Sequence, residues 1–270
     1  MSTSGSAVTG QRTLIVGASS GIGRGLARAL IDHGATVVAS ARRLDRLEEL
    51  DGATPIACDV TKPGDVEALV EGAVDKMGGL DTLIYATGLS RLHGLDQASY
   101  EDWLELFSTN LFGATLLTRA ALPHLQADGS HGRAVFLTSD SADQPYPGLV
   151  VYGTSKAALR AYTQGLAAEY IDLRVTEVVI GATAGTEVAD HFDPDLFGQW
   201  LPRWYEEGYI RYEMLQVDDV ASMIIEVLEA DAPPAVLRAT GPEGDQTIEE
   251  AIEMAPPDQS AVGSALRPSS

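Results

Sequence analysis

The stretch TLIVGASSGIG, residues 13–23, joins a short apolar run to a turn that contains three glycines. An apolar run of this kind is typical of a strand buried on both faces, so we expect a strand over Thr13–Val16. From Gly21 to His33 the apolar residues recur at helical spacing. Glycines between a strand and a helix let the backbone approach a phosphate at the helix N-terminus. The turn is therefore predicted to bind a phosphate group, although a glycine-rich turn can also serve only as a connection.

The same alternation of short apolar runs and longer helical stretches continues along the chain. Further strands are predicted over Thr36–Ser40, Pro55–Cys58, Thr82–Tyr85, Ala134–Thr138, Arg174–Ile180 and Val236–Ala239. Further helices are predicted over Leu44–Leu50, Pro63–Met77, Tyr100–Leu125, Thr154–Tyr170 and Val217–Leu228. Strand–helix repeats with short connections form right-handed crossovers and a parallel sheet. The sequence therefore predicts an α/β fold, a doubly wound Rossmann-type parallel sheet of about seven strands with helices on both faces.

No linker divides the chain, so residues 1–253 are expected to form a single dinucleotide-binding domain, with residues 254–270 as a disordered tail. The segment Val188–Tyr212 interrupts the strand–helix pattern. We interpret it as a lid over a bulky apolar substrate, while packing against a partner subunit or the sheet is an equally good explanation. Its seven aromatic residues are Phe192, Phe197, Trp200, Trp204, Tyr205, Tyr209 and Tyr212.

The composition limits the classes of function. The 270 residues carry a formal net charge of −21, which argues against a surface for nucleic acid or anionic membranes. Residues 1–10 lack a basic-then-apolar signal, and no apolar run approaches the roughly 20 residues that span a bilayer. Cys58, the single cysteine, cannot form an internal disulfide, so we expect a cytoplasmic protein. The histidines are scattered without metal-ligand spacing, and no metal site is predicted.

The residues after the predicted strand Thr36–Ser40 indicate which dinucleotide the chain would bind. An acidic residue there accepts from a ribose 2′-hydroxyl, whereas a 2′-phosphate calls for arginine. This chain has Ser40-Ala41-Arg42-Arg43 at that point, with no carboxylate. We therefore expect NADP(H) to be preferred, with NAD(H) possible. Alternatively, Arg42 and Arg43 only begin a solvated helix, in which Asp45 and Glu48 are their partners.

Four polar residues form a candidate catalytic group. Tyr152 and Lys156 are four apart and therefore share one face of a helix. The ammonium is expected to lower the phenol pKa from its usual value of about 10, which suits acid/base chemistry. Ser139 lies 13 residues before Tyr152, at the end of a strand, and Asn110 interrupts a helical pattern. Taken singly, Ser139 is equally well a strand-end cap, Asn110 a buried hydrogen-bonding residue and Tyr152 a packing aromatic.

The G-x-x-x-G-x-G turn and the order of these four residues resemble the single-domain branch of the short-chain dehydrogenase/reductase family, over roughly Gln11 to Ala239. The resemblance implies that Tyr152 is the acid/base, that Ser139 positions the substrate oxygen, and that Lys156 holds the ribose. It also implies that Asn110 bends its helix and holds a water that relays protons towards the lysine. The implied cofactor-binding residues are Gly17, Ser19, Ser20, Gly21, Ile22, Gly23, Arg42, Arg43, Asp59, Val60, Thr87, Gly88, Tyr152, Lys156, Gly181 and Thr186.

Some positions depart from the family pattern without removing a catalytic group. Val16 replaces a threonine, and Tyr85-Ala86-Thr87-Gly88 stands where Asn-Asn-Ala-Gly is usual. Ile180 replaces the proline before Gly181. Asp59 is placed to contact the adenine amine, although an exposed turn aspartate is nearly as good an explanation.

The expected activity is hydride transfer that interconverts a carbonyl and a secondary alcohol, as an NADPH-dependent ketoreductase with a bulky apolar small-molecule substrate. Asp143 and Gln144 are placed to contact polar groups of that substrate. The alternative is a cofactor-binding sensor without turnover, which would typically lack the Tyr/Lys pair. An epimerase would need more chain after Gly181. Family resemblance also implies a homodimer or homotetramer built on the helices over Tyr100–Leu125 and Thr154–Tyr170.

Overall fold

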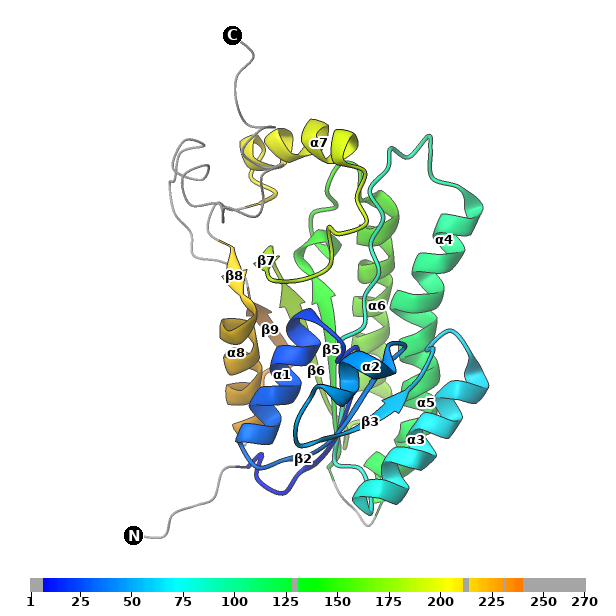
Figure 1. Ribbon diagram of the computed structural model, residues 1–270, viewed down its shortest axis with the longest axis vertical. Coiled ribbons are helices and arrows are strands. Elements are labelled where there is room, and N and C mark those ends of the chain that lie inside the picture. Colours follow the sequence, from blue (N-terminus) through cyan, green and yellow to red (C-terminus); the bar gives the residue numbers. More distant parts are fainter. Residues whose placement is uncertain (1–6, 128–130, 211–213, 231, 240–270) are drawn as a thin grey trace.

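The computed structural model describes residues 7–127, 131–210, 214–230 and 232–239. Its centre is a seven-stranded sheet of order β3-β2-β1-β4-β5-β6-β9, in which every pairing is parallel (Figure 1). The strands are β1 (Arg12–Val16), β2 (Thr36–Ala41), β3 (Ala53–Ala57), β4 (Thr82–Tyr85), β5 (Arg133–Ser139), β6 (Arg174–Ile180) and β9 (Val236–Ala239). The strand order reverses between β1 and β4, where sheets of this kind bind ligands at their carboxyl edge. The predicted Rossmann-type sheet is confirmed.

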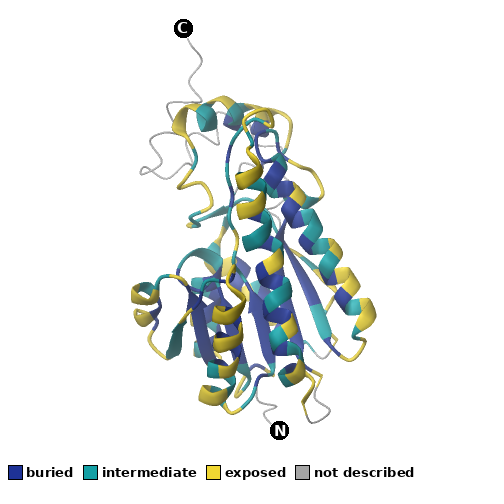
Figure 2. Ribbon diagram, turned by 90° about the vertical axis from the view of Figure 1, so that its right-hand side faces the viewer, coloured by how far each residue is buried: buried dark blue, intermediate teal, exposed yellow. Residues whose placement is uncertain are grey.

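Helices cover both faces of the sheet. One face carries α1 (Gly21–Asp32), α2 (Leu44–Glu48) and α8 (Val217–Glu229), and the other carries α3 (Pro63–Met77), α5 (Gly113–Leu125) and α6 (Val150–Glu169). Successive residues of a strand point to opposite faces. Accordingly, Ile15 packs with the first group of helices, and Leu14 and Val16 pack with the second. This explains why the strands read as continuous apolar runs, and Figure 2 shows the sheet buried between its helices.

Two helix predictions need correction. The helix predicted from Thr154 begins at Val150, so Tyr152 lies in its first turn. Gly153 does not end the helix but allows close packing, since a Cβ there would lie 2.9 Å from the Ser141 carbonyl oxygen. The single helix predicted over Tyr100–Leu125 is divided into α4 (Tyr100–Phe107), the π-helical turn η1 (Ser108–Phe112) and α5.

The aromatic-rich segment contains a helix that periodicity did not predict, α7 (Pro194–Glu206). Asp193 caps it, because its carboxylate accepts from the backbone N–H groups of Asp195 and Leu196, each at 3.0 Å. Nearby, the short strands β7 (Thr183–Ala184) and β8 (Leu215–Gln216) pair in parallel. Figure 1 shows α7 at one end of the molecule, with β7 and β8 between it and the sheet. Tyr212 and the predicted tail over residues 254–270 lie outside the described residues.

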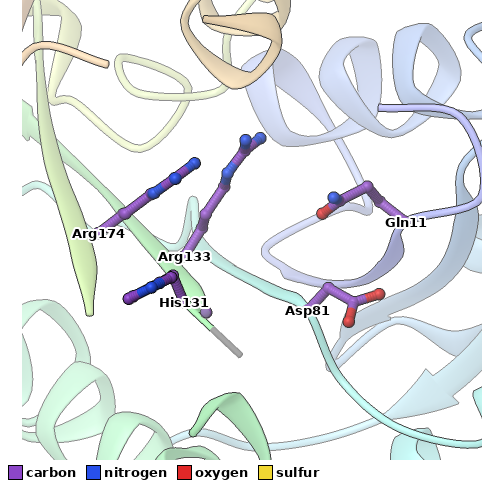
Figure 3. Close-up of a pocket in the computed structure, with 6 residues that line it drawn as sticks. Gln11, Asp81, His131, Arg133 and Arg174 are labelled. Carbon is purple, nitrogen blue, oxygen red and sulfur yellow. The ribbon is translucent and has the colours of Figure 1, made fainter. Parts of the chain in front are cut away.

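A small cavity of about 180 Å³ opens at the edge of the sheet where the strands begin. Arg133 and Arg174, which begin β5 and β6, face Gln11 and Asp81 across it (Figure 3). It lies at the amino ends of the strands, away from the edge at which ligands of such sheets bind. None of the helices in the described part of the chain is long and apolar enough to cross a membrane.

Candidate active site

The glycine turn after β1 is packed too tightly for side chains. Gly17 has a φ of +99°, and a Cβ there would lie 2.7 Å from the Thr87 backbone nitrogen. A Cβ on Gly23 would lie 2.3 Å from the Gly17 carbonyl oxygen. Ser20 caps α1 without a side-chain hydrogen bond to its N–H groups, and no acidic residue lies in the first turn. The turn therefore leaves helix N–H groups available to an anion and fits the pyrophosphate of a dinucleotide.

Arg43, rather than Arg42, reaches this turn. Its Nη2 donates to the hydroxyls of Ser19 at 2.9 Å and Ser20 at 3.1 Å. Arg42 is exposed beside Asp59. Burial opposes ionisation of Asp59, but hydrogen bonds from Thr61, with Lys62 and Arg42, lower its pKa overall.

The structure does not bring the side chains of Asp59 and Val60 to the glycine turn. The Asp59 carboxylate accepts from the Thr61 hydroxyl at 2.7 Å and from the Thr61 N–H at 3.1 Å, so it closes its own turn. Val60 is 6% exposed and packs in the core on the α3, α5 and α6 side. The role of both residues in binding adenine remains a prediction.

The sequence did not indicate Glu187, whose carboxylate binds the side chains of Arg43 and Ser20 at the glycine turn. Its carboxylate accepts from Arg43 Nη2 at 2.7 Å, from the Ser20 hydroxyl at 2.9 Å and from Arg46. The hydrogen bond from Arg43 is the main cause that lowers the Glu187 pKa to about 2. Glu187 lies 144 residues from Arg43 in sequence, so no local pattern could pair them.

Three predicted cofactor residues, Gly88 after β4 and Gly181 and Thr186 after β6, lie at the carboxyl edge of the sheet. A Cβ on Gly88 would lie 3.3 Å from Lys156 Nζ, and Thr186 packs 3.5 Å from the place of a Cβ on Gly21. The Gly181 N–H donates to the Ala239 carbonyl at 2.8 Å, which holds the end of β6 against β9. These residues therefore flank the space between the glycine turn and α6.

Tyr152, Lys156 and Ser139 meet at the end of β5. The Ser139 hydroxyl lies near enough to the Tyr152 phenol to oppose the rise of its pKa. Lys156 is 4% exposed, and its Nζ donates to the Leu137 carbonyl at 3.0 Å and lies 5.9 Å from the centre of the Tyr152 ring. The side chains of Tyr152 and Lys156, from the first two turns of α6, therefore face the last residues of β5.

The expectation that Lys156 lowers the phenol pKa is wrong for this arrangement. Burial raises the pKa of Tyr152 to about 12, the Asp140 carboxylate adds to the rise, and only the Ser139 hydrogen bond opposes it. Burial also lowers the pKa of Lys156 to about 8. The lysine amine donates to the Leu137 carbonyl, and desolvation of the phenol is the largest influence on its pKa.

Ser139 accepts hydrogen bonds from the Ser141 N–H at 3.2 Å and the Ser141 hydroxyl at 3.0 Å. Its own hydroxyl donates to Asp140 Oδ1 at 3.1 Å. Burial raises the pKa of Asp140, whose second oxygen accepts from Tyr146 at 2.9 Å. Asp140 was not predicted, although its position directly after Ser139 could have indicated it.

Asn110 is fully buried inside η1 and has three hydrogen bonds. Its Nδ2 donates to the Leu89 carbonyl at 2.9 Å and to Ser155 Oγ at 2.8 Å, while its Oδ1 accepts from the Leu89 N–H at 2.8 Å. The helix is interrupted at Asn110, and the Tyr85 hydroxyl donates to the carbonyl of Thr109. Asn110 thus ties the loop after β4 to α6, next to the turn that carries Lys156.

A third apolar cluster, centred on Tyr146, Leu149, Leu201 and Trp204, covers the same end of α6, and the Tyr152 ring packs against it. The expectation that Asp143 contacts substrate is not supported, because its carboxylate is paired with Arg160 and with Arg238. Gln144 is exposed. Among the described residues, no three His, Cys, Asp or Glu side chains gather as a metal site would require.

A parallel sheet with a glycine turn at its first crossover, and with serine, tyrosine and lysine together at its carboxyl edge, is typical of NAD(P)-dependent oxidoreductases. The family model for short chain dehydrogenases matches residues 11–196, and the chain belongs to this family.

Its relatives share most of its length. The chain is 36% identical to an uncharacterized oxidoreductase of Staphylococcus saprophyticus over 72% of this chain and 82% of the relative. It is 31% identical to the NADP-dependent 3-hydroxy acid dehydrogenase YdfG of Shigella flexneri, over 66% and 74% of the two chains. The structure of a 3-ketoacyl-(acyl-carrier-protein) reductase from Brucella melitensis, complexed with NADH, superposes with a TM-score of 0.75 at 26% identity. That superposition covers 87% of this chain and 98% of the other.

Proposed function

We propose that this protein is an NADPH-dependent carbonyl reductase whose proton donor is Tyr152. The observation that carries the proposal is the meeting of Ser139 and Tyr152 at the end of β5, one helical turn from the buried amine of Lys156. When bound at the glycine turn, the cofactor supplies the hydride. The substrate oxygen takes its proton from Tyr152, and Ser139 holds that oxygen in place.

The protonation state of Tyr152 suits it to act as the proton donor in carbonyl reduction. With a pKa of about 12, the phenol keeps its proton at neutral pH and is ready to donate it to a developing alkoxide. Lys156 Nζ lies beside Gly88, where a cofactor ribose can approach without meeting a side chain. Asn110 acts through α6 and the Leu89 backbone, and so positions the lysine-bearing turn.

Preference for NADP(H) over NAD(H) rests on Arg43. The guanidinium lies with the hydroxyls of Ser19 and Ser20 at the glycine turn, and no acidic residue stands at the end of β2. Such a group of donors suits a 2′-phosphate. One relative is named as NADP-dependent, whereas one similar structure holds NADH, so the preference depends on this chain's own residues.

The substrate is proposed to be bulky and apolar, with α7 as the lid. The cluster of Tyr146, Leu149, Leu201 and Trp204 lies against the Tyr152 ring, so a substrate carbonyl near the phenol meets an apolar wall.

Assembly as a homodimer or homotetramer is part of the proposal. Tyr100, Leu104 and Phe112, along α4 and η1, are 73%, 49% and 47% exposed, more than is usual for large apolar side chains. Light scattering of the wild type and Leu104→Glu tests the assembly: a smaller particle for the variant supports it, and a monomeric wild type contradicts it.

A cytoplasmic location is also part of the proposal. It agrees with Cys58, a single free thiol that is buried and whose pKa burial raises to about 12, so that it stays protonated and unreactive.

The activity is tested with a panel of aromatic and aliphatic ketones and aldehydes, following the absorbance of the reduced nicotinamide with NADPH and NADH separately. The proposal expects turnover of bulky apolar carbonyls, with a clear advantage for NADPH. Tight NADP binding without turnover of any carbonyl or alcohol would instead identify a sensor. Equal kcat/KM values for NADPH and NADH would contradict the role of Arg43.

A further inference from the structure

Glu187 fills the centre of the group of donors that the proposed function assigns to the cofactor. Its Oε2 accepts from both Arg43 at 2.7 Å and Ser20 at 2.9 Å, and its Oε1 accepts from Arg43 at 3.3 Å and from Arg46. Arg43 also contacts Ser19. Donors from the glycine turn and α2 thus converge on a single carboxylate.

These donors are the kind that bind a phosphate. A guanidinium binds carboxylate and phosphate oxygens with the same paired geometry, and serine hydroxyls donate to either. Ser20 is the residue before α1, where the helix dipole also favours an anion. The carboxylate therefore takes the position that a phosphate monoester would fill.

The backbone that carries Glu187 crosses the edge of the glycine turn. Thr186 packs over Gly21, and the Val188 carbonyl accepts from the Ser90 hydroxyl at 2.6 Å. Because contacts hold Thr186 and Val188 on either side, the fold itself places Glu187 beside Arg43. Glu187 and Arg43 are 32% and 40% exposed, so the pair is open enough to exchange partners.

We propose that Glu187 is an internal competitor for the 2′-phosphate of NADP(H), and that it thereby sets the affinity of the site for that cofactor. The inference rests on the proposed NADP preference. The 2′-phosphate would compete with the carboxylate for the Arg43 Nη2 donor and would repel it, so NADP binding favours displacement of the carboxylate from Arg43. NAD, which lacks the 2′-phosphate, does not require this displacement.

The test is calorimetric titration of the full-length protein with NADP⁺ and with NAD⁺, without substrate. Glu187→Gln removes the charge and keeps the shape. It should tighten NADP⁺ binding by about three- to fivefold, the size of a released surface ion pair, and leave NAD⁺ binding within about twofold. Glu49→Gln is the matched control: it removes the same charge from a pair with Arg24, outside the contacts of Arg43, and should change neither affinity.

Arg43→Ala, alone and combined with Glu187→Gln, shows whether the effect passes through the arginine. The gain from Glu187→Gln should disappear when Arg43 is absent. The proposal is overturned if the gain in NADP⁺ affinity persists without Arg43, or if both cofactors gain equally. Either result would show that Glu187→Gln acts only by making the protein less negative. Weaker NADP⁺ binding in Glu187→Gln also overturns it, since Glu187 would then hold Arg43 in place for the cofactor.

The outcomes separate this inference from the function beneath it. If the wild type prefers NADP⁺ and Arg43→Ala abolishes the preference, but Glu187→Gln changes nothing, only the competitor role fails. If the wild type binds both cofactors equally and Arg43→Ala affects neither, the NADP preference fails and the competitor role fails with it.

Discussion

Lys156 donates from its Nζ to the carbonyl of Leu137 at 3.0 Å, which ties the first turns of α6 to the end of β5. Leu137 precedes Ser139 by two residues on the same strand. The contact therefore holds the lysine beside the serine and tyrosine, but at the cost of a cation that is almost completely buried.

Replacing Lys156 with methionine should abolish turnover and stabilise the fold. Burial lowers the lysine pKa from 10.5 to about 8, so at pH 7 the charge costs up to about 3 kcal/mol of unfolding free energy. Between pH 8 and pH 10.5 the unfolded state binds more protons, so the wild type gains stability as pH rises and the variant does not. Urea titrations across this range measure the difference, and a variant less stable than the wild type at pH 7 would contradict the prediction.

Removing the Asn110 amide should disturb the site and the fold together. Asn110→Ala leaves the Leu89 backbone groups and Ser155 without their partner, which should cost about 2–4 kcal/mol of unfolding free energy. Ser155→Ala, which removes only one of these bonds, should cost about 1 kcal/mol. Both are read by denaturation, and equal losses would show that the Leu89 contacts contribute little.

Asp140 should control the pH at which Tyr152 ionises. Its carboxylate contributes to the raised pKa of the phenol, so Asp140→Asn should move the rise in kcat/KM for alcohol oxidation towards lower pH, by about 0.5–1 unit. Asp143→Asn is the control, since that carboxylate pairs with Arg160 and Arg238. If the rise in kcat/KM shifts by the same amount in both variants, Asp140 has no specific role in setting the pKa of Tyr152.

A buried ion pair fixes α6 against the sheet. Glu177, 3% exposed on β6, accepts from Arg160 at 2.7 Å and from the Thr138 hydroxyl at 2.6 Å. Glu177→Ala should destabilise the protein by about 1–3 kcal/mol, because the Thr138 hydroxyl loses its acceptor and Arg160 keeps only Asp143 as a partner. Thr138→Val removes a single hydrogen bond and should cost only about 1 kcal/mol. Thermal unfolding checks the order of the two losses.

The sheet and most helices could be predicted, because buried strands are continuous apolar runs and the helices have an apolar face. The meeting of Ser139, Tyr152 and Lys156 was predictable from their spacing. The helix α7 was not, since its buried residues Leu201, Trp204 and Tyr205 pack on loops rather than on the sheet. The pKa of Tyr152 and the pairing of Glu187 with Arg43 depend on burial and on contacts between distant segments, which no local pattern encodes.

Tyr152→Phe tests the central claim most directly, because it removes one hydroxyl and keeps the ring that packs against the aromatic cluster. The measurement pairs the single-turnover rate of carbonyl reduction with the Kd for NADP⁺. We predict that the rate falls by about 10³-fold or more, while the Kd changes by less than about threefold. A variant that binds NADP⁺ normally and reduces carbonyls at near wild-type rate would contradict the account.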